Sequence, residues 1–437
     1  MAASEGVSLA RVLIACETPV GDAALRRAGA LAQVLQQAGH EPLLAVPDLP
    51  RAESLLADSG VALLPSPTWQ TRVEGLPAVH TYTDLLLRQG FADATGLRGL
   101  ARGWRQLVTL LGVDLVVAHH APVALFATRG MGLPRLRFGD GFDCPPLATP
   151  MPPMTWWDSA PEPFDVIGER SALHVAQQAS TDLGLPDPGC VVDVLHAEAD
   201  ALCTPTELDV YPARGAATWC GPLLALPEGG PVPLPEGGGD TVYVALRARH
   251  PLLVPLLQLL RANGRRVLLQ LGGGSPEVAR QLTSEHVVVA RTPVAPGQVR
   301  QHCRHAVLDG HPTRTPGVAL AGLPQLMLPT RLEQMMLARR VQDAGAGLLM
   351  DARAASETAT VPMTLDTSLH RLLDDATLAQ GAKTLARKYA GHDDARTLAA
   401  VLGLVQALLA AAAGDDDAPR AKRSRSWPRW RKAKSGG

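Results

Sequence analysis

The segment from residue 307 to residue 320 holds the residue types best suited to binding a charged ligand. It reads as a short apolar strand, a turn rich in Gly, Pro and Thr, and a short helix. In an α/β protein, such a strand-turn-helix points backbone N–H groups at a phosphate. Polar groups that could complete the site lie in this turn and after an earlier strand: Gly310, His311, Thr313, Arg314, Thr315, Arg247 and Arg249. For the arginines, a solvated surface is the alternative interpretation.

The residues that follow extend this pattern into a longer motif. They are Gly322, Pro324, Pro329, Glu333, Gln334, Ala338, Val341, Gly345 and Gly347. Together with residues 307–320 they resemble the GT-B-fold glycosyltransferases of family 1, the UDP- and TDP-sugar transferases of antibiotic and flavonoid glycosylation. That family carries H-G-G-x-G-T-x-x-E-A-L-x-x-G-x-P, followed by P-x-x-x-(D/E)-Q-x-x-x-A-x-x-V-x-x-x-G-x-G.

The resemblance assigns roles to individual residues of the motif. Counting back from Leu320 places Gly310 at the family His, Thr315 at the Thr and Val318 at the Glu that holds the ribose hydroxyls. Only one residue separates Leu320 from Gly322, where the family has two. A second alignment, in which His311 corresponds to the family His, therefore remains possible. Val cannot accept a hydrogen bond, so we expect weaker nucleotide affinity or a different donor. Arg314 would supply charge where a glycine is missing, and Glu333 and Gln334 would hold sugar hydroxyls.

Two further positions concern the proton transfer that a glycosyltransferase needs. In the resembling family, the first loop carries Gly-His, and this His is the general base; here Gly21-Asp22 stand at those positions. His119 stands where the family has the supporting acid. We therefore predict an exchanged pair of Asp22 and His119, because an imidazole oriented by a carboxylate can take the proton of an attacking hydroxyl. The alternative is that Asp22 caps the following helix and that His119 is a polar residue at a strand end.

Aromatic residues around the expected acceptor side could contact an apolar or sugar ring. His120 follows His119, and Phe142, Trp156 and Trp157 lie in or after the loop that begins at Gly139. We interpret these four residues as acceptor-binding. Ordinary packing of a lid is the alternative for the two tryptophans.

The composition limits the class of protein. The chain of 437 residues is 46% hydrophobic, which is enough for two domains with full cores. Its net charge of −1 argues against nucleic-acid binding by the whole protein, and its six scattered cysteines are typical of reduced thiols in the cytoplasm. We identify no apolar run long enough to span a membrane.

Apolar runs and helical patterns alternate along the chain, which predicts doubly wound parallel sheets. Strands are expected at 12–16, 41–46, 61–64, 114–118, 135–138, 241–246, 267–271, 287–290, 306–308 and 325–328. We predict a GT-B fold of two Rossmann-like domains. Their expected limits are residues 1–222 (acceptor-binding), a Pro/Gly linker at 223–240, residues 241–391 (nucleotide-sugar-binding), a helix at 392–413 that crosses back to the first domain, and a disordered basic tail at 414–437.

The favoured interpretation is an inverting, metal-independent glycosyltransferase without a cofactor, using a nucleotide sugar as co-substrate and a hydroxyl acceptor. A catalytically silent relative that acts as a binding or accessory module is the first alternative, and an enzyme that changes the reaction, as nucleotide-sugar epimerases do, is the second. The tail carries eight Lys or Arg between Arg420 and Lys434, with Trp427 and Trp430 among them. It suggests a peripheral contact with an anionic membrane surface from the cytoplasm.

Overall fold

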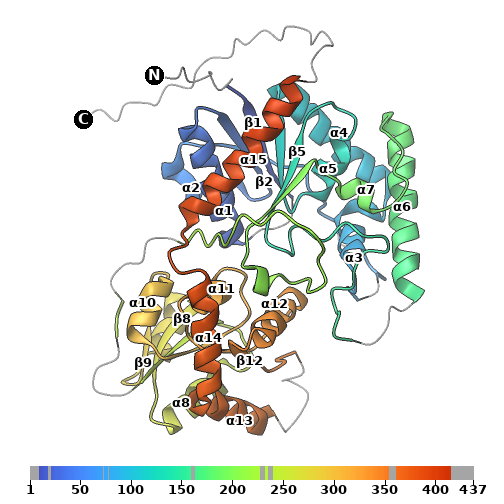
Figure 1. Cartoon of the computed structure of the whole chain (residues 1–437). Coiled ribbons are helices and arrows are strands. Elements are labelled where there is room, and N and C mark those ends of the chain that lie inside the picture. Colours follow the sequence, from blue (N-terminus) through green and yellow to red (C-terminus); the bar gives the residue numbers. More distant parts are fainter. Residues whose placement is uncertain are drawn as a thin grey trace, which may run out of the picture.

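The computed structural model describes residues 9–17, 21–71, 73–76, 78–158, 163–226, 232–234, 240–353 and 361–414. Two parallel sheets, one above the other in Figure 1, form the centres of two halves of the molecule. Each sheet has six strands, and each half wraps its sheet with helices. The predicted α/β class with two Rossmann-like sheets is therefore confirmed.

The first sheet has the strand order β3-β2-β1-β4-β5-β6. Its strands are β1 (Arg11–Cys16), β2 (Glu41–Val46), β3 (Ala62–Pro65), β4 (Leu115–His119), β5 (Arg135–Gly139) and β6 (Ala199–Leu202). Its helices are α1 (Asp22–Gln37), α2 (Leu49–Leu56), α3 (Tyr82–Leu86), α4 (Ala94–Leu111), α5 (Pro122–Ala127), α6 (Pro163–Leu183) and α7 (Val192–Leu195), with short turns η1 (Ala57–Ser59), η2 (Leu87–Phe91) and η3 (Thr206–Leu208). Because β1 pairs with β4 so that Cys16 lies beside His119, their carboxyl ends meet at one edge.

The second sheet repeats this topology, with the order β12-β11-β10-β7-β8-β9. Its strands are β7 (Thr241–Arg247), β8 (Arg266–Gly272), β9 (Val287–Val289), β10 (His305–Leu308), β11 (Gln325–Met327) and β12 (Gly347–Leu349). The helices that follow are α8 (Leu253–Ala262), α9 (Pro276–Leu282), α10 (Pro296–His302), α11 (Arg314–Leu320), α12 (Leu332–Asp343), α13 (Val361–Asp374), α14 (Ala376–Lys388) and α15 (Asp394–Gly414).

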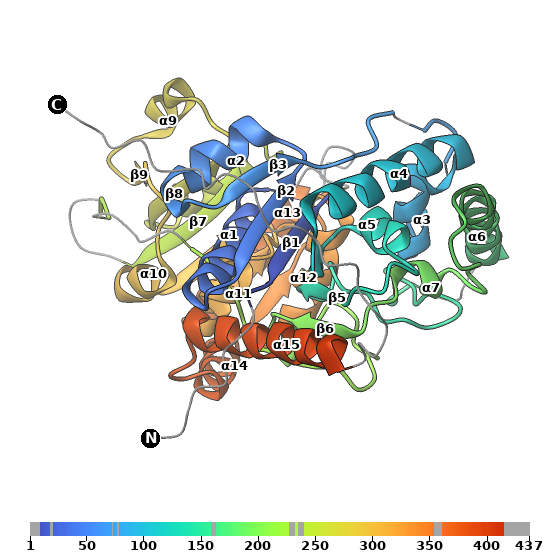
Figure 2. The same ribbon diagram turned by 90° about the horizontal axis from the view of Figure 1, so that it is seen from above.

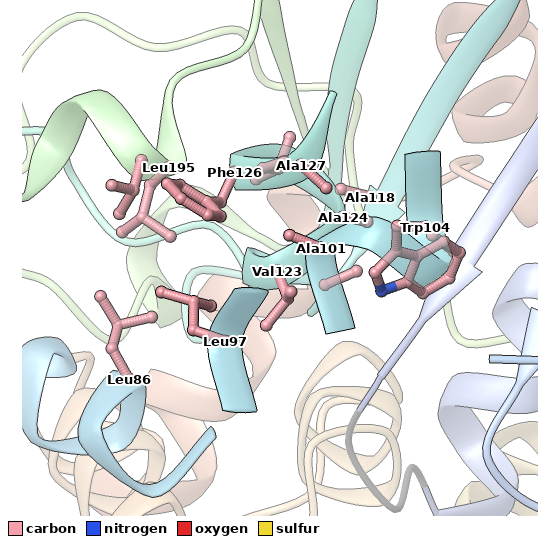
Figure 3. Close-up of a cluster of buried hydrophobic side chains, with 14 of the residues drawn as sticks. Leu86, Leu97, Ala101, Trp104, Ala118, Val123, Ala124, Phe126, Ala127 and Leu195 are labelled. Atoms are coloured by element: carbon pink, nitrogen blue, oxygen red, sulfur yellow. The ribbon is translucent and has the colours of Figure 1, made fainter. Parts of the chain in front are cut away.

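The core of the first half holds the end of β4 and the start of α5 in place. Figure 3 shows side chains from α3, α4, β4, α5 and α7 that meet in one cluster: Leu86, Leu97, Ala101, Trp104, Ala118, Val123, Ala124, Phe126, Ala127 and Leu195. All of them are buried. The histidines between β4 and α5 are thus set in a rigid frame.

Hydrophobic contacts at two places join the halves. Helix α15 returns from the lower half and runs across the upper one in Figures 1 and 2, where Leu398, Val401 and Val405 pack in the same hydrophobic cluster as residues of α1 and β1. A second cluster combines residues that follow the first sheet, such as Leu208 and Tyr211, with residues of α12. The segment after β6 is therefore packed against the lower half.

Two features differ from the sequence-based expectations, and a third is not described by the structure. Strands β6 and β12 were not expected, because both are short and β6 contains Asp200, which pairs with Arg137 of β5. Contrary to our expectation, α15 is long and apolar enough to cross a membrane by length and composition; in the structure it contacts α1 and β6. The predicted disordered tail lies, from residue 415 on, outside the described residues.

Candidate functional site

The loop between β10 and α11 is held against α12 by a glycine. Gly310 has a left-handed backbone with φ of +82°, and a Cβ atom there would lie 2.6 Å from the carbonyl oxygen of Gln334. Only glycine combines this conformation with so close an approach. The loop therefore has one position relative to α12, at the carboxyl edge of the second sheet, where ligands bind in doubly wound folds.

Three buried oxygen atoms of this loop have no hydrogen-bond partner in the described part of the chain. They are Oδ1 of Asp309 and the hydroxyls of Thr313 and Thr315. Buried polar atoms in native proteins are almost always satisfied, and one that is not costs about 1–3 kcal/mol. Three such atoms within seven residues indicate a place where a polar ligand completes the structure.

His311 lies in the same loop, where the charges of several arginines act on it. Burial, followed by the charges of Arg314, Arg27, Arg331 and Arg247, lowers the pKa of His311 to about 3. The imidazole is therefore neutral near pH 7, and its Nδ1 accepts a hydrogen bond from the backbone N–H of Thr313. This bond leaves the other ring nitrogen, Nε2, as the N–H donor.

The four arginines come from both halves, with Arg27 on α1 and the others in the second half. The positive charge of these arginines suits a phosphate or diphosphate, to which Arg can donate two parallel hydrogen bonds. Arg27 itself is paired with Asp140 and Asp143. Arg249, which we predicted at this site, is exposed in the turn after β7. The sequence analysis missed Arg27, because it lies on a helical face that otherwise reads as apolar.

Glu333 and Gln334 already have protein partners. Glu333 pairs with Arg331, with 2.8 Å between the carboxylate oxygen and Nε. The side-chain oxygen of Gln334 accepts hydrogen bonds from the backbone N–H and hydroxyl of Thr330, at 3.0 and 3.2 Å. Their predicted role toward sugar hydroxyls stays a prediction.

Helix α11 is too short to provide the strong dipole expected from its sequence. It has only seven residues, so its dipole adds little and the positive charge of the site comes from the arginines. Val318 is buried in a hydrophobic cluster with Val299 and Leu323. This position therefore contributes to the core of the second half.

A second polar cluster lies at the carboxyl edge of the first sheet, around Asp143. Its carboxylate is 3.6 Å from Nδ1 of His119, 3.4 Å from Nδ1 of His120 and 3.7 Å from the guanidinium of Arg27. Burial by itself raises the pKa of Asp143, but the two imidazoles and Arg27 together hold it below its usual range. Arg27 also pairs with Asp140 at 3.1 Å.

The predicted pair of Asp22 and His119 is corrected by these contacts. Asp22 lies on the surface, where its carboxylate accepts hydrogen bonds from Arg51. His119 is fully buried; its Nδ1 is 3.0 Å from the carbonyl oxygen of Phe138, and burial lowers its pKa. The acid beside His119 is Asp143. Sequence reasoning missed it, although Asp140 and Asp143 follow β5 just as the histidines follow β4.

The four predicted acceptor residues separate into two pairs. His120 and Phe142 stack, with ring centroids 5.5 Å apart and planes inclined by 16°. Trp156 donates a hydrogen bond to the carbonyl oxygen of Val210 at 3.1 Å. The ring of Trp157 lies 4.4 Å below the guanidinium of Arg339 of α12. Trp157 thus contributes to the contact between the halves, whereas Trp156 is hydrogen-bonded within the first half. The acceptor-binding role of the four residues stays a prediction.

Two Rossmann-like halves with polar clusters at the carboxyl edges of both sheets define the GT-B class of fold, the fold of the nucleotide-sugar transferases that the sequence resembles. Residues 256–402 match the family model described as "Erythromycin biosynthesis protein CIII-like, C-terminal domain". No curated protein matches the chain in sequence.

Solved structures give the same result for the whole chain. The glycosyltransferase VinC in complex with dTDP matches with 17% identity and a TM-score of 0.63, covering 92% of this chain and 100% of that one. The spinosyn rhamnosyltransferase SpnG, complexed with spinosyn aglycone, matches with 18% identity and a TM-score of 0.63, covering 90% and 100%. SsfS6 of Streptomyces sp. SF2575 matches with 18% identity and a TM-score of 0.56, covering 91% and 99%. These similarities confirm the GT-B fold.

Proposed function

We propose that the protein is a cytoplasmic glycosyltransferase that moves a sugar from a nucleoside-diphosphate donor to a hydroxyl acceptor, with inversion and without a metal ion. The observation that supports it most directly is the loop after β10. There, Asp309, Thr313 and Thr315 carry buried oxygen atoms without a hydrogen-bond partner among the described residues, and the charges of four arginines act on His311. These groups together suit the ribose and diphosphate of a nucleotide.

The similar structures agree with this choice of ligand. One structure of VinC holds dTDP and one of SpnG holds thymidine diphosphate. In the present chain, Arg314 and Arg331 would neutralise the diphosphate as it leaves. His311, as a neutral imidazole with an N–H at Nε2, would donate to a phosphate oxygen.

Calorimetric titration with TDP and UDP tests the proposal. We expect one of them to bind, and we expect Arg314→Gln to weaken the binding by about 1–3 kcal/mol, because a charge-assisted hydrogen bond is lost. The matched control is Arg280→Gln; Arg280 is exposed on α9 and pairs with Glu277, so its loss should leave the affinity unchanged.

A protein that binds neither nucleotide would contradict the proposal and favour the silent relative, which has no need of a donor. An Arg314→Gln variant that binds the nucleotide as tightly as the unchanged protein would show that the nucleotide does not bind at this loop.

A further inference from the structure

We propose that His120 is the general base of this transfer, that Asp143 orients it, and that Gln89 positions the attacking hydroxyl. This inference rests on the proposed function, since it names the base of that same reaction. It replaces the pair of Asp22 and His119 with groups that are in contact.

The first argument is the position of His120. It follows β4 at the carboxyl edge of the first sheet, and its backbone is left-handed with φ of +52°. A non-glycine residue in this region is uncommon, and such conformations concentrate at functional sites. Stacking on Phe142 fixes the ring, and only 8% of the side chain is exposed.

The second argument is the tautomer that its neighbours impose. Nδ1 of His120 lies 3.4 Å from the carboxylate of Asp143, which only accepts hydrogen bonds when ionised. Nε2 lies 3.3 Å from the side-chain nitrogen of Gln89, which only donates. The proton of a neutral ring is therefore on Nδ1, and the lone pair on Nε2 accepts from Gln89. A substrate hydroxyl would take the place of this donor and give its proton to Nε2, as a general base requires.

The third argument is an unsatisfied atom beside this lone pair. The side-chain oxygen of Gln89 is buried and has no partner in the part of the chain that the structure describes. Gln89 lies in η2, where its φ and ψ of −114° and 26° interrupt the helix. Such interruptions of helices are frequent at functional sites. A hydroxyl group placed here could contact both this oxygen and Nε2 of His120.

His119 is excluded as the base by its surroundings. None of its side chain is exposed, and burial lowers its pKa. Its contact with Asp143 makes it part of the frame that holds the carboxylate.

The cluster is also connected to the donor side. Arg27 lies 3.7 Å from Asp143, and its charge acts on His311 in the loop after β10. The charge of one guanidinium thus acts both on the carboxylate beside His120 and on the histidine of the donor loop.

The reaction step follows from this arrangement. The acceptor hydroxyl gives its proton to Nε2 of His120, and its oxygen forms a bond to the anomeric carbon of the sugar. The bond from that carbon to the diphosphate oxygen breaks, and the electron pair leaves with the nucleoside diphosphate. His120 then releases its proton to solvent, so the net products are the glycoside, the nucleoside diphosphate and a proton.

The test compares two acceptors, using TDP-glucose or UDP-glucose as the donor. Phenol needs a base to attack, whereas 4-nitrophenol is largely ionised in a mildly alkaline assay, about one pH unit above its pKa, and does not. We expect His120→Gln to slow transfer to phenol by about 10²- to 10⁴-fold, but transfer to 4-nitrophenol by much less. Asp143→Asn should show the same selective loss. The control His40→Gln changes a buried histidine just before β2, at the opposite edge of the same sheet, and should slow neither reaction.

Equal losses with both phenols, or no loss with phenol, would overturn the assignment. A second measurement does not need turnover: ¹⁵N NMR of the imidazole should show the proton of neutral His120 on Nδ1 in the unchanged protein and a redistribution in Asp143→Asn. A proton on Nε2 would rule out His120 as the base even if TDP binds. Absence of nucleotide binding, measured separately by calorimetry, would instead count against the proposed function.

Discussion

At the scale of single residues, the candidate site depends on one glycine more than on any charged group. Gly310 allows the loop after β10 to touch the backbone of Gln334 in α12. In the family motif, Gly310 stands at the position of the histidine, and the motif gives the glycine no role of its own. The sequence therefore located this residue correctly, but its steric role came from the packing of α12.

We predict that Gly310→Ala lowers the free energy of unfolding by about 2–4 kcal/mol, because the left-handed backbone and the 2.6 Å approach to Gln334 both oppose a Cβ atom. Urea denaturation measures this change. The control is Gly345→Ala, with φ of +67° but no atom within 4 Å of the new Cβ, which should cost only about 1 kcal/mol for its backbone. Equal costs at the two sites would mean that the loop is not pressed against α12.

At the scale of elements, α15 connects the two halves in a way that a hydropathy pattern does not show. Asp394, at its start, accepts hydrogen bonds from the backbone N–H groups of Leu224 and Ala225, at 2.9 and 2.8 Å. One side of the helix then packs against α1. The segment that leads into the second half and the segment that leads out of it are therefore adjacent.

We predict that Leu398→Ala destabilises the protein by about 2–5 kcal/mol, since it removes a buried side chain from the cluster that α15 shares with α1. The comparison is Leu404→Ala on the same helix, where the side chain is only partly buried and the loss should be clearly smaller. Thermal and urea unfolding would measure both. Similar, small losses would show that α15 does not contribute to the core of the first half.

At the scale of the whole molecule, the halves are tied together by polar contacts as well as by α15. The hydroxyl of Tyr389 donates to Glu207 at 2.7 Å, and Lys388 pairs with the same carboxylate at 2.7 Å. Burial by itself raises the pKa of Glu207, but Lys388 and Tyr389 lower it to about 2. Stability from this carboxylate is therefore present above its unfolded-state pKa near 4.5 and is lost as the pH falls toward 2.

The basic tail adds a prediction at this scale. Deleting residues 415–437 should leave Tm unchanged, because its composition does not support a packed core. The deletion should abolish a salt-sensitive attachment to vesicles that contain anionic lipids, to which each Lys or Arg contributes about 1 kcal/mol; neutral vesicles are the control. A large drop in Tm would show that the tail packs on the body, and unchanged attachment would place the contact elsewhere.

The sequence by itself determined the alternating elements and the GT-B fold. Strands such as β1 and β4 consist mainly of continuous apolar runs. Such a run predicts a strand that is buried on both faces, and it can be recognised from neighbouring residues alone. It also located the loop of the second half to which we assign the donor, because motif spacing is local as well.

Only the tertiary structure decided which residues meet. Asp143 contacts His119 and His120 because β4 and β5 are neighbours in the sheet, and Arg27 joins them from α1, more than ninety residues earlier in the chain. Such contacts depend on strand order and on the packing of the helices, which hydrophobic periodicity does not encode. For this reason the sequence predicted a pair of a histidine and an acid, but Asp22 is not the acid that contacts His119, and the adjacent His120 contacts the same carboxylate of Asp143.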